Sequence, residues 1–391
     1  MLSLLRRACK SLAQTALGLS ALALAACTPG TGPVPTVGGG SGKVQVALLV
    51  PGGSGQASDE MLAKSLQNAA RMAISDLNGV QVDLRVYNTA GQPGQAASMA
   101  TKAVAEGAQV ILGPVYAQEA NAAGVAVASS GVSVLAFSNN PDIAGNNVFV
   151  LGTTFDSVAR TLGRYAVGTG KSNVMIVHDR TTAGEIGRAA IQRGWTSAGG
   201  SVVGTASYEF SQNGIVQAAP QIAAQARGAG AQAVFLTADT AGALPLISQL
   251  LSENGLATGA VQYVGLSRWD IPAATLSLPG VQGGLFALPD PGTYGAFVSR
   301  YQAAFGESPN PILSGLAYDG IAAIGALAGK AGGGPIPKSA LTQGAGFLGV
   351  NGIFRLRSDG TNDRGLAVAQ VTGGTYRIVQ AAPKAFGGAG F

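Results

Sequence analysis

Few residues of this chain have the types and spacing that catalysis requires. His178 is the single histidine, so a Ser-His-Asp triad would have to use it, and no G-x-S-x-G motif is present to display a nucleophilic serine. Zinc sites need several His or Cys ligands, and the only cysteines are Cys9 and Cys27. The segment Gly168 to Ser172 resembles the end of a phosphate-binding loop, but it precedes a predicted strand instead of opening a helix. We therefore expect a protein that is not an enzyme and uses no metal and no cofactor.

Polar side chains that follow predicted strands are better candidates for chemistry, because ligands of open parallel sheets bind at the carboxyl ends of the strands. The candidate ligand-binding residues are Ser54, Tyr116, Ala117, Ser138, Asn139, Asn140, His178, Arg180, Thr181, Asp239, Thr240, Arg268 and Trp269. Helices are predicted just after several of these loops, and their free N–H groups favour a carboxylate or another anionic group. The alternatives are that the loops are only turns, that His178 finishes a strand and that Trp269 belongs to the core.

These loops are positioned by segments that alternate between strand-like and helix-like patterns. Apolar runs predict strands at Val44 to Val50, Val80 to Val86, Val110 to Leu112, Val132 to Phe137, Val174 to Val177, Val202 to Val203, Val234 to Leu236 and Val261 to Val264. Helical patterns lie between them, for example at Gln95 to Glu106 and Gly184 to Ser197. Alternation of this kind predicts an α/β fold with parallel sheets. About 350 residues follow the N-terminal region, too many for one such sheet, so we expect two doubly wound lobes.

The pattern changes toward the C-terminus. Two helices are predicted at Tyr294 to Phe305 and Ser314 to Ala328, where Tyr318 is expected to pack and Asp319 to hydrogen-bond at a hinge. Short strands follow at Gly352 to Leu356, Leu366 to Val371 and Tyr376 to Val379, with a polar turn over Ser358 to Asp363.

The N-terminal region has the layout of an export signal. Cations precede a short apolar stretch, and Leu24 to Cys27 resembles a bacterial lipobox, so residues 1–26 are predicted to be a signal peptide and Cys27 a lipidation site. Residues 27–42 are rich in Pro, Gly, Thr and Ser and predict a flexible tether. Removal of the signal takes away three positive charges and lowers the net charge from +5 to +2 (5 − 3). Without a basic cluster, nucleic acid is not an expected partner.

Three segments carry a family resemblance: Gly107 to Pro114, Val132 to Ser138 and Val174 to Asp179. They resemble type I periplasmic binding proteins of the leucine/isoleucine/valine-binding group, over essentially Lys43 to Gln380. The resemblance implies two lobes, a ligand cleft between them that closes by hinge motion, and three crossovers.

The resemblance also implies where the chain passes between the lobes. The crossovers are expected near Gly152 to Phe155, Gly284 to Pro289 and Gly365 to Val371. The lobe boundaries implied are 43–154 plus 287–365 for the N-terminal lobe, 155–286 plus 366–380 for the C-terminal lobe, and a tail at 381–391.

Amino-acid binders of that family hold the ligand carboxylate through loops that match Gly113 to Tyr116 and Ser138 to Asn140. They hold the ammonium and side chain with an aromatic residue and an acid, at places where this chain has Ala183, Ser267 and Arg268. An arginine repels an ammonium group and attracts an anion, so this chain departs from the pattern of ordinary branched-chain amino-acid binders.

Later segments resemble a second branch of the same fold, the lipoproteins called penicillin-binding protein activators. The segments are Leu266 to Asp270, Gly283 to Pro291, Leu316 to Asp319 and Asn351 to Arg355. Our first hypothesis is therefore a periplasmic lipoprotein that regulates a penicillin-binding protein. Thr28 after the predicted lipidated cysteine resembles the pattern of sorted lipoproteins, which implies an anchor in the outer rather than the inner membrane. The second hypothesis is the substrate-binding lipoprotein of an ABC transporter for amino acids or a related small anionic metabolite, with a permease as partner. An enzyme is the third and weakest.

Overall fold

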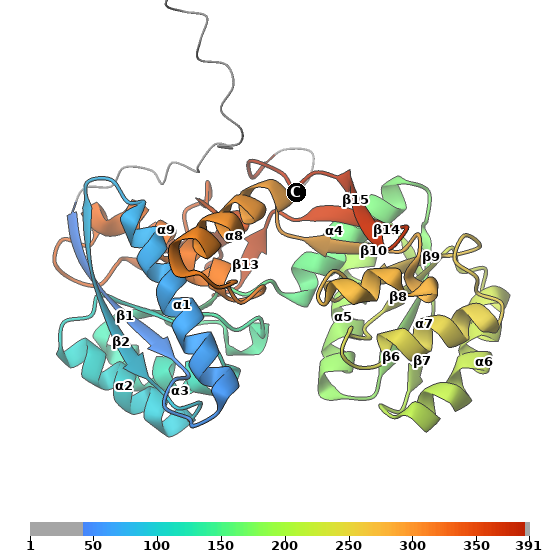
Figure 1. Ribbon diagram of the computed structural model, residues 1–391, viewed down its shortest axis with the longest axis horizontal. Coiled ribbons are helices and arrows are strands. Elements are labelled where there is room, and N and C mark those ends of the chain that lie inside the picture. The colour runs from blue at the N-terminus through green and yellow to red at the C-terminus, as the bar shows by residue number, and fades with distance from the viewer. Residues whose placement is uncertain (1–41, 388–391) are drawn as a thin grey trace, which may run out of the picture. The chain divides into compact units, whose positions relative to one another are not determined.

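The computed structural model of the protein describes residues 42–387. The signal peptide, Cys27 and the tether lie outside the described residues, apart from Gly42. Within residues 42–387 the strands form three sheets, of five, seven and three strands. Two of these sheets form the centres of the two α/β lobes that the sequence predicts, which confirms the fold class (Figure 1).

The first sheet belongs to the N-terminal lobe, and its strands are all parallel. Its order is β2 (Val80–Asn88), β1 (Gly42–Val50), β3 (Val110–Leu112), β4 (Ser133–Ala136) and β5 (Val148–Val150). The apolar run of β1 is buried because β1 pairs with β2 on one side and β3 on the other and is covered on both faces. The strand β5 was not expected from the sequence.

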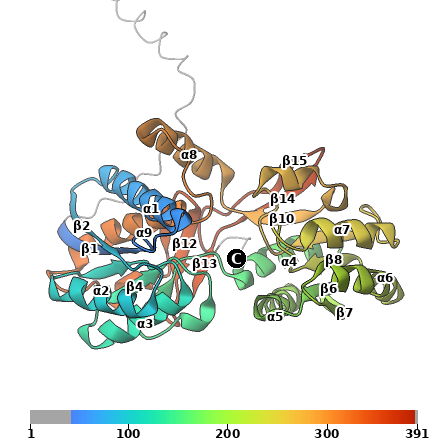
Figure 2. The same ribbon diagram turned by 60° about the horizontal axis from the view of Figure 1, so that its bottom comes forward.

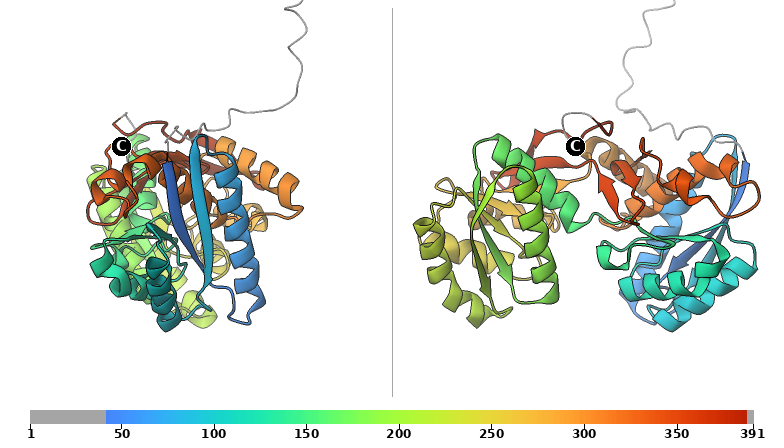
Figure 3. Two further views of the ribbon diagram at one scale, coloured as in Figure 1. Left: turned by 90° about the vertical axis from the view of Figure 1, so that its left-hand side faces the viewer. Right: turned by 180° about the vertical axis from the view of Figure 1, so that it is seen from behind.

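Helices cover both faces of the first sheet. On one face lie α2 (Pro93–Ala105) and α3 (Ala117–Val127), and on the other α1 (Ala57–Ser75), α8 (Pro291–Phe305) and α9 (Ser314–Leu327) (Figures 2 and 3). Asp76, at the C-terminal end of α1, links the three helices of the second face. Its carboxylate accepts from Arg300 of α8 at 2.6 Å and from the hydroxyl of Tyr318 of α9. Tyr318 is fully buried, which confirms that it packs.

The second sheet belongs to the C-terminal lobe. Its order is β15 (Thr375–Gln380), β14 (Ala367–Thr372), β10 (Leu285–Leu288), β9 (Gln262–Gly265), β8 (Ala233–Leu236), β6 (Asn173–Asp179) and β7 (Ser201–Tyr208). It is parallel from β7 to β10, and β14 and β15 add an antiparallel edge. β7 extends well beyond the two valines that predicted it.

The second sheet is also covered on both faces. The helices α4 (Phe155–Gly168) and α5 (Thr182–Ser197), green in Figure 3, pack on one face with the fully buried Trp195. The helices α6 (Gln212–Gly228) and α7 (Leu244–Glu253) pack on the other.

A small antiparallel sheet lies beside α9. It consists of β11 (Phe347–Gly349), β12 (Gly352–Leu356) and β13 (Asn362–Arg364). The polar turn expected over Ser358 to Asp363 is shorter than that, because Asn362 and Asp363 belong to β13 and are buried. The remaining short elements are α10 (Lys338–Leu341) and single helical turns at Ala128–Ser130, Pro141–Ile143, Ala273–Ser277, Pro279–Val281 and Ala328–Lys330.

The chain passes between the lobes three times. The passages are residues 151–154 after β5, 289–290 after β10 and 365–366 after β13. Each passage falls within or next to an expected crossover, but most of Gly284 to Pro289 is strand β10 and most of Gly365 to Val371 is strand β14.

The first and third passages are tied together. The Asn362 side chain donates to the carbonyl of Val150 at 2.7 Å, and Arg364 donates to that of Leu151 at 2.8 Å. Arg364 also pairs with Asp319 of α9 at 2.9 Å. Asp319 therefore hydrogen-bonds beside the third passage, as expected. None of the helices between residues 42 and 387 combines the length and the apolar character needed to cross a bilayer.

Candidate ligand-binding site

Each parallel sheet has one point where the strand order reverses, and ligands of open α/β sheets bind in the crevice at such points. In the first sheet the reversal lies between β1 and β3, and in the second between β6 and β8. The loops after these four strands contain Ser54, Tyr116, the pair Arg180 and Thr181, and the pair Asp239 and Thr240. The structure thus gathers the predicted residues of each lobe at one sheet edge.

Gly113 allows the loop after β3 to pass close to the end of β1. Its φ is +89°, and a Cβ atom there would lie 2.3 Å from the carbonyl oxygen of Leu49. Only glycine fits this conformation and this contact. The loop then delivers Tyr116, whose hydroxyl donates to Asp59 at 2.7 Å. The hydrogen bond to Asp59, together with partial burial, raises the pKa of Tyr116 to about 12.

Acidic residues accumulate at this edge of the first sheet. The backbone N–H of Gly53 donates to Glu60 at 2.6 Å. Glu119, in the first turn of α3, is fully buried, and burial raises its pKa in spite of nearby donors at Thr89 and Tyr116. The loops 51–56, 89–92, 113–116 and 137–140 contain no Lys or Arg. This charge pattern argues against the expectation of a net anionic ligand, although the free N–H groups of α3 can still receive a carboxylate.

The loop after β4 is a polar turn with one exposed side chain. The Ser138 hydroxyl accepts from the N–H of Asn140 at 3.1 Å, and the Asn140 side chain accepts from the N–H of Asp142 at 2.9 Å. Ser138 is buried, whereas Asn139 is exposed. Ala117 begins α3, whose first N–H groups have no side-chain cap. Ser54 accepts from the N–H of Gln56 at 3.1 Å.

In the C-terminal lobe, Asp179 organises the edge. Its carboxylate accepts from the N–H of Thr181 at 3.0 Å and from the hydroxyl of Thr237 at 3.3 Å. Thr181 in turn caps α5, because its hydroxyl accepts from the N–H of Gly184 at 3.1 Å. The Thr240 hydroxyl donates to the carbonyl of Ile271 at 2.6 Å.

The sequence analysis missed Tyr208, the last residue of β7. Its hydroxyl is buried and has no hydrogen-bond partner among residues 42–387. Burial raises its pKa, and the negative charges of Asp179 and Asp239 raise it further. The phenol therefore lies near two carboxylates at the β6 end of the edge. The sequence analysis also left Asp179 out of the candidates, although its position at the end of a buried strand could have identified it.

The basic residues expected at the second edge are already paired. Arg180 donates to Glu209 at 2.6 Å, and both side chains are exposed. Arg268 makes two hydrogen bonds to Asp270, one of them at 2.9 Å from Nε to Oδ1. Each of these arginines is matched by one carboxylate, so the pair carries no net charge and attracts a further anion only weakly. The anion preference that Arg268 suggested is therefore offset within the chain.

Two predicted residues do not offer their side chains to a ligand. Trp269 is fully buried and packs against Phe286, so the expectation that it stacks on a ligand is corrected. His178 is 4 % exposed, and its Nδ1 lies 3.0 Å from the carbonyl oxygen of Asp179 and 3.6 Å from Glu185. Its ring is enclosed within the C-terminal lobe, which corresponds to the alternative that it finishes a strand.

Among residues 42–387 no group of three or more His, Cys, Asp or Glu side chains could hold a metal ion. The candidate site consists of amide and hydroxyl groups with nearby carboxylates at two sheet edges. Such groups orient and hold a small polar molecule. The fold and the site together define a two-lobed binding protein.

Comparisons with known proteins agree with this class. The family model described as periplasmic binding protein matches residues 43–375, so the chain belongs to the periplasmic binding protein family. A comparison with curated protein sequences gave no match.

Several solved structures are similar over their whole length. One is a protein from Rhodospirillum rubrum provisionally described as a branched-chain amino acid ABC transporter, with a TM-score of 0.72 and 20% identity, covering 87% of this chain and 100% of that chain. A second is an ABC transporter substrate-binding protein from Desulfitobacterium hafniense in complex with Leu. Its TM-score is 0.65 at 16% identity, and the match covers 86% of this chain and 100% of that chain. A third is a solute-binding protein of an ABC transporter from Rhodopseudomonas palustris BisB5 in complex with 3,4-dihydroxybenzoic acid. Its TM-score is 0.59 at 19% identity, and the match covers 88% of this chain and 98% of that chain. At these identities the likeness shows the fold alone.

Proposed function

We propose that this protein is the substrate-binding component of an ABC transporter for a small zwitterionic, amino-acid-like molecule. The observation that carries the proposal is the difference in chemistry between the two sheet edges. The first edge offers the uncapped N–H groups of α3 and the exposed amide of Asn139, beside carboxylates that already accept hydrogen bonds. The second edge offers Asp179 and Asp239, and its arginines are already paired.

The edge of the C-terminal lobe suits an ammonium group. Asp179 and Asp239 lie near the unpartnered hydroxyl of Tyr208, whereas Arg180 and Arg268 are engaged by Glu209 and Asp270. A cation near two carboxylates is stabilised by their charge, more strongly where water is partly excluded. The side chain of Asp239 is exposed and therefore accessible to a ligand.

The edge of the N-terminal lobe suits a carboxylate. The helix α3 begins without a side-chain cap, and the exposed Asn139 lies in the loop after the neighbouring strand. Asp59 and Glu60 accept from Tyr116 and Gly53, and their charges oppose a ligand with further negative charge. A ligand whose carboxylate is balanced by an ammonium group meets both conditions better than a simple anion.

The comparisons support the transport hypothesis better than regulation of a penicillin-binding protein. The named similar structures belong to ABC transport systems, and none is a penicillin-binding protein activator. We therefore place the transport role first and an ABC permease as the expected partner. A crosslinked pull-down that recovers a penicillin-binding protein synthase and no permease would reverse this order.

Lipidation at Cys27 and an anchor in the outer rather than the inner membrane remain predictions from the sequence. They concern residues outside 42–387. Mass spectrometry of the mature N-terminus tests the first, and separation of inner and outer membranes tests the second. An inner-membrane location would agree better with a transport partner.

Thermal unfolding with a panel of ligands tests the proposal. The panel contains neutral α-amino acids and, as the anionic alternative, benzoate and dicarboxylates. A bound ligand at 100 times its Kd adds about 2.7 kcal/mol to the free energy of unfolding. We expect at least one amino acid to raise the Tm and the simple anions to leave it unchanged.

Two variants locate the effect. Asp239→Asn should weaken amino-acid binding at least tenfold, whereas Asp83→Asn, at an exposed ion pair of β2, should leave it unchanged. Stabilisation by benzoate but by no amino acid would contradict the proposal.

A further inference from the structure

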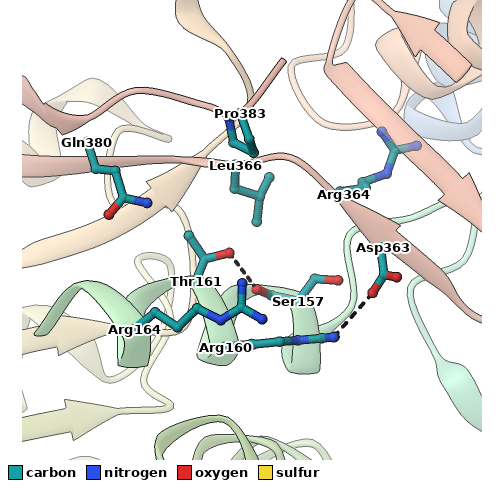
Figure 4. A pocket seen from close by; sticks show the side chains of 9 residues that line it. All are labelled: Ser157, Arg160, Thr161, Arg164, Asp363, Arg364, Leu366, Gln380 and Pro383. Atoms are coloured by element: carbon teal, nitrogen blue, oxygen red, sulfur yellow. Dashed lines mark hydrogen bonds and ion pairs between the residues drawn. The ribbon is translucent and has the colours of Figure 1, made fainter. Parts of the chain in front are cut away.

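A cluster of arginines surrounds a single carboxylate beside the passages between the lobes. Asp363 of β13 accepts from Arg355 of β12 at 2.9 Å, from Arg357 at 2.6 and 3.0 Å, and from Arg160 of α4 at 3.2 Å. Figure 4 shows Arg160 reaching from α4 to Asp363. This cluster lies outside the sheet edges described above and plays no part in the proposed amino-acid site.

The cluster carries an excess of positive charge. One carboxylate faces three guanidinium groups, which leaves a net charge of +2 (3 − 1) on these four residues. The Asp363 side chain is 4 % exposed and accepts through both oxygens, so it has little capacity to neutralise more. Burial lowers the pKa of Arg160; the attraction of Asp363 opposes this shift, and the charges of Arg357 and Arg164 add to it.

Hydrogen-bond donors remain at the same place. Arg160 uses only Nη1, and Arg357 uses Nε and Nη2, in hydrogen bonds to residues of the range 42–387. Each guanidinium has five N–H donors in a planar fork. The unused donors of both side chains therefore remain for a ligand with several acceptor oxygens.

A cavity of about 380 Å³ opens beside these donors. Arg160 and Arg357 line it together with Thr154, Asp156, Arg193 and Asp359. Arg193 neutralises Asp156 through two hydrogen bonds of 2.9 and 3.0 Å. Asp359 accepts from the N–H and the hydroxyl of Thr361 at 2.9 and 2.6 Å. Asp359 is thus the one acid lining the cavity that no cation pairs with at contact distance within residues 42–387, and its charge opposes an anion.

We propose that this cavity is a binding site for a phosphate group, held by Arg160 and Arg357. Guanidinium forks match the oxygens of a tetrahedral phosphate in pairs, and they remain charged at any physiological pH. A dianion would also cancel the net charge of the cluster. Arg160 belongs to α4 of the C-terminal lobe and Arg357 to the turn after β12, so a bound phosphate would bridge that helix and that turn.

Calorimetric titration of the intact protein with inorganic phosphate at low ionic strength tests the proposal. We expect saturable binding at one site, at least tenfold weaker in Arg357→Gln. Asp359→Asn keeps the acceptor for Thr361 and removes the opposing charge, so it should bind phosphate at least threefold more tightly. Arg377→Gln removes an equal charge from an exposed site on β15 and should bind like the original protein.

The source of the phosphate group is distinguished by two further titrations. Glycerol phosphate represents soluble phosphomonoesters, and vesicles containing phosphatidylglycerol represent a lipid headgroup. Binding of either that Arg357→Gln abolishes supports the site and identifies the source.

Several results would overturn the proposal. They are the absence of binding to all three probes, equal losses in Arg357→Gln and Arg377→Gln, or no gain in Asp359→Asn. Far-ultraviolet circular dichroism checks that each variant is folded. Repeating the phosphate titration with a stabilising amino acid present separates this site from the amino-acid site, because failure of either leaves the other measurable.

Discussion

At the scale of single residues, the buried pair of Asp319 and Arg364 is the most consequential interaction near the passages. Both side chains are at most 1 % exposed and their charged atoms lie 2.9 Å apart. Asn351 donates to the same carboxylate at 2.9 Å from its side chain. A buried pair of this kind contributes little net stability compared with apolar residues, but removal of one partner leaves an uncompensated charge.

Asp319→Ala should therefore lower the free energy of unfolding by about 3–5 kcal/mol. Urea denaturation followed by circular dichroism measures the change. Asp83→Ala is the matched control, because its partner Arg85 is exposed and such pairs contribute about 0–1 kcal/mol. A loss below about 1 kcal/mol in Asp319→Ala would mean that Arg364 finds another counter-charge or water.

Asp363 gives a prediction for the dependence of stability on pH. Burial alone would raise its pKa, but the hydrogen bonds from Arg357 and Arg355 outweigh burial and lower the pKa below its ordinary value. The native carboxyl therefore ionises more readily than the unfolded one, whose pKa is about 3.9. The resulting stability is present above about pH 4 and is lost as the pH falls through the lower native pKa.

Asp363→Asn should be less stable than the original protein at pH 7, and the difference should shrink as the pH is lowered below about 4. Thermal unfolding across that range, in buffers without phosphate, measures this convergence. A difference between the two proteins that stays constant from pH 7 to pH 3 would contradict the assignment of the shift to Asp363.

At the scale of secondary-structure elements, helix starts fix the geometry around the passages. Asp290 lies two residues after the end of β10 and caps α8, because its carboxylate accepts from the N–H groups of Gly292 and Thr293 at 2.9 and 3.2 Å. It also pairs with Lys384. One side chain thus begins the helix that covers the first sheet at the point where the chain leaves the second.

Asp290→Ala should cost about 1 kcal/mol of folding free energy, the usual loss for an N-cap. Lys384→Ala separates the ion pair from the cap and should cost less, because Lys384 is 72 % exposed. Both are measured by chemical denaturation. Equal losses in the two variants would assign the effect to the ion pair.

The elements also show what the sequence could predict. Buried parallel strands such as β1 and the amphipathic helices around them have patterns long enough to recognise, and they were predicted within a few residues. The strands β5, β10 and β13 contain three or four residues and were not predicted, whereas β3 and β8 are equally short and were recognised as apolar runs. Recognition of such short strands is incomplete because pairing with neighbours distant in sequence defines them.

The candidate site was predictable in its location but not in its contacts. The polar residues that follow predicted strands do lie at the carboxyl edges of the two sheets. Whether a side chain faces solvent depends on packing, as Trp269 shows. Gly265 and Gly284 leave space for its ring, because a Cβ atom at either would lie 2.2 or 2.4 Å from it. The pairing of Arg268 with Asp270 likewise depends on the local turn, which the sequence pattern does not reveal.

At the scale of the whole molecule, two α/β lobes present edges of different chemistry from one chain. Residues from both lobes are needed if a zwitterion is held by its carboxylate at one edge and by its ammonium group at the other. The first and third passages, tied by Asn362 and Arg364, are the connections through which a change in one lobe would reach the other. Membership of the periplasmic binding protein family agrees with a role for both lobes in ligand binding.

The most direct measurement is calorimetric titration of the best amino acid from the unfolding panel into three variants. Asn139→Ala alters the first sheet edge, Asp239→Asn alters the second, and Asp83→Asn is the control. The account predicts that both edge variants bind at least tenfold more weakly than the original protein, while the control is unchanged. Full affinity in either edge variant would contradict a ligand held by both lobes.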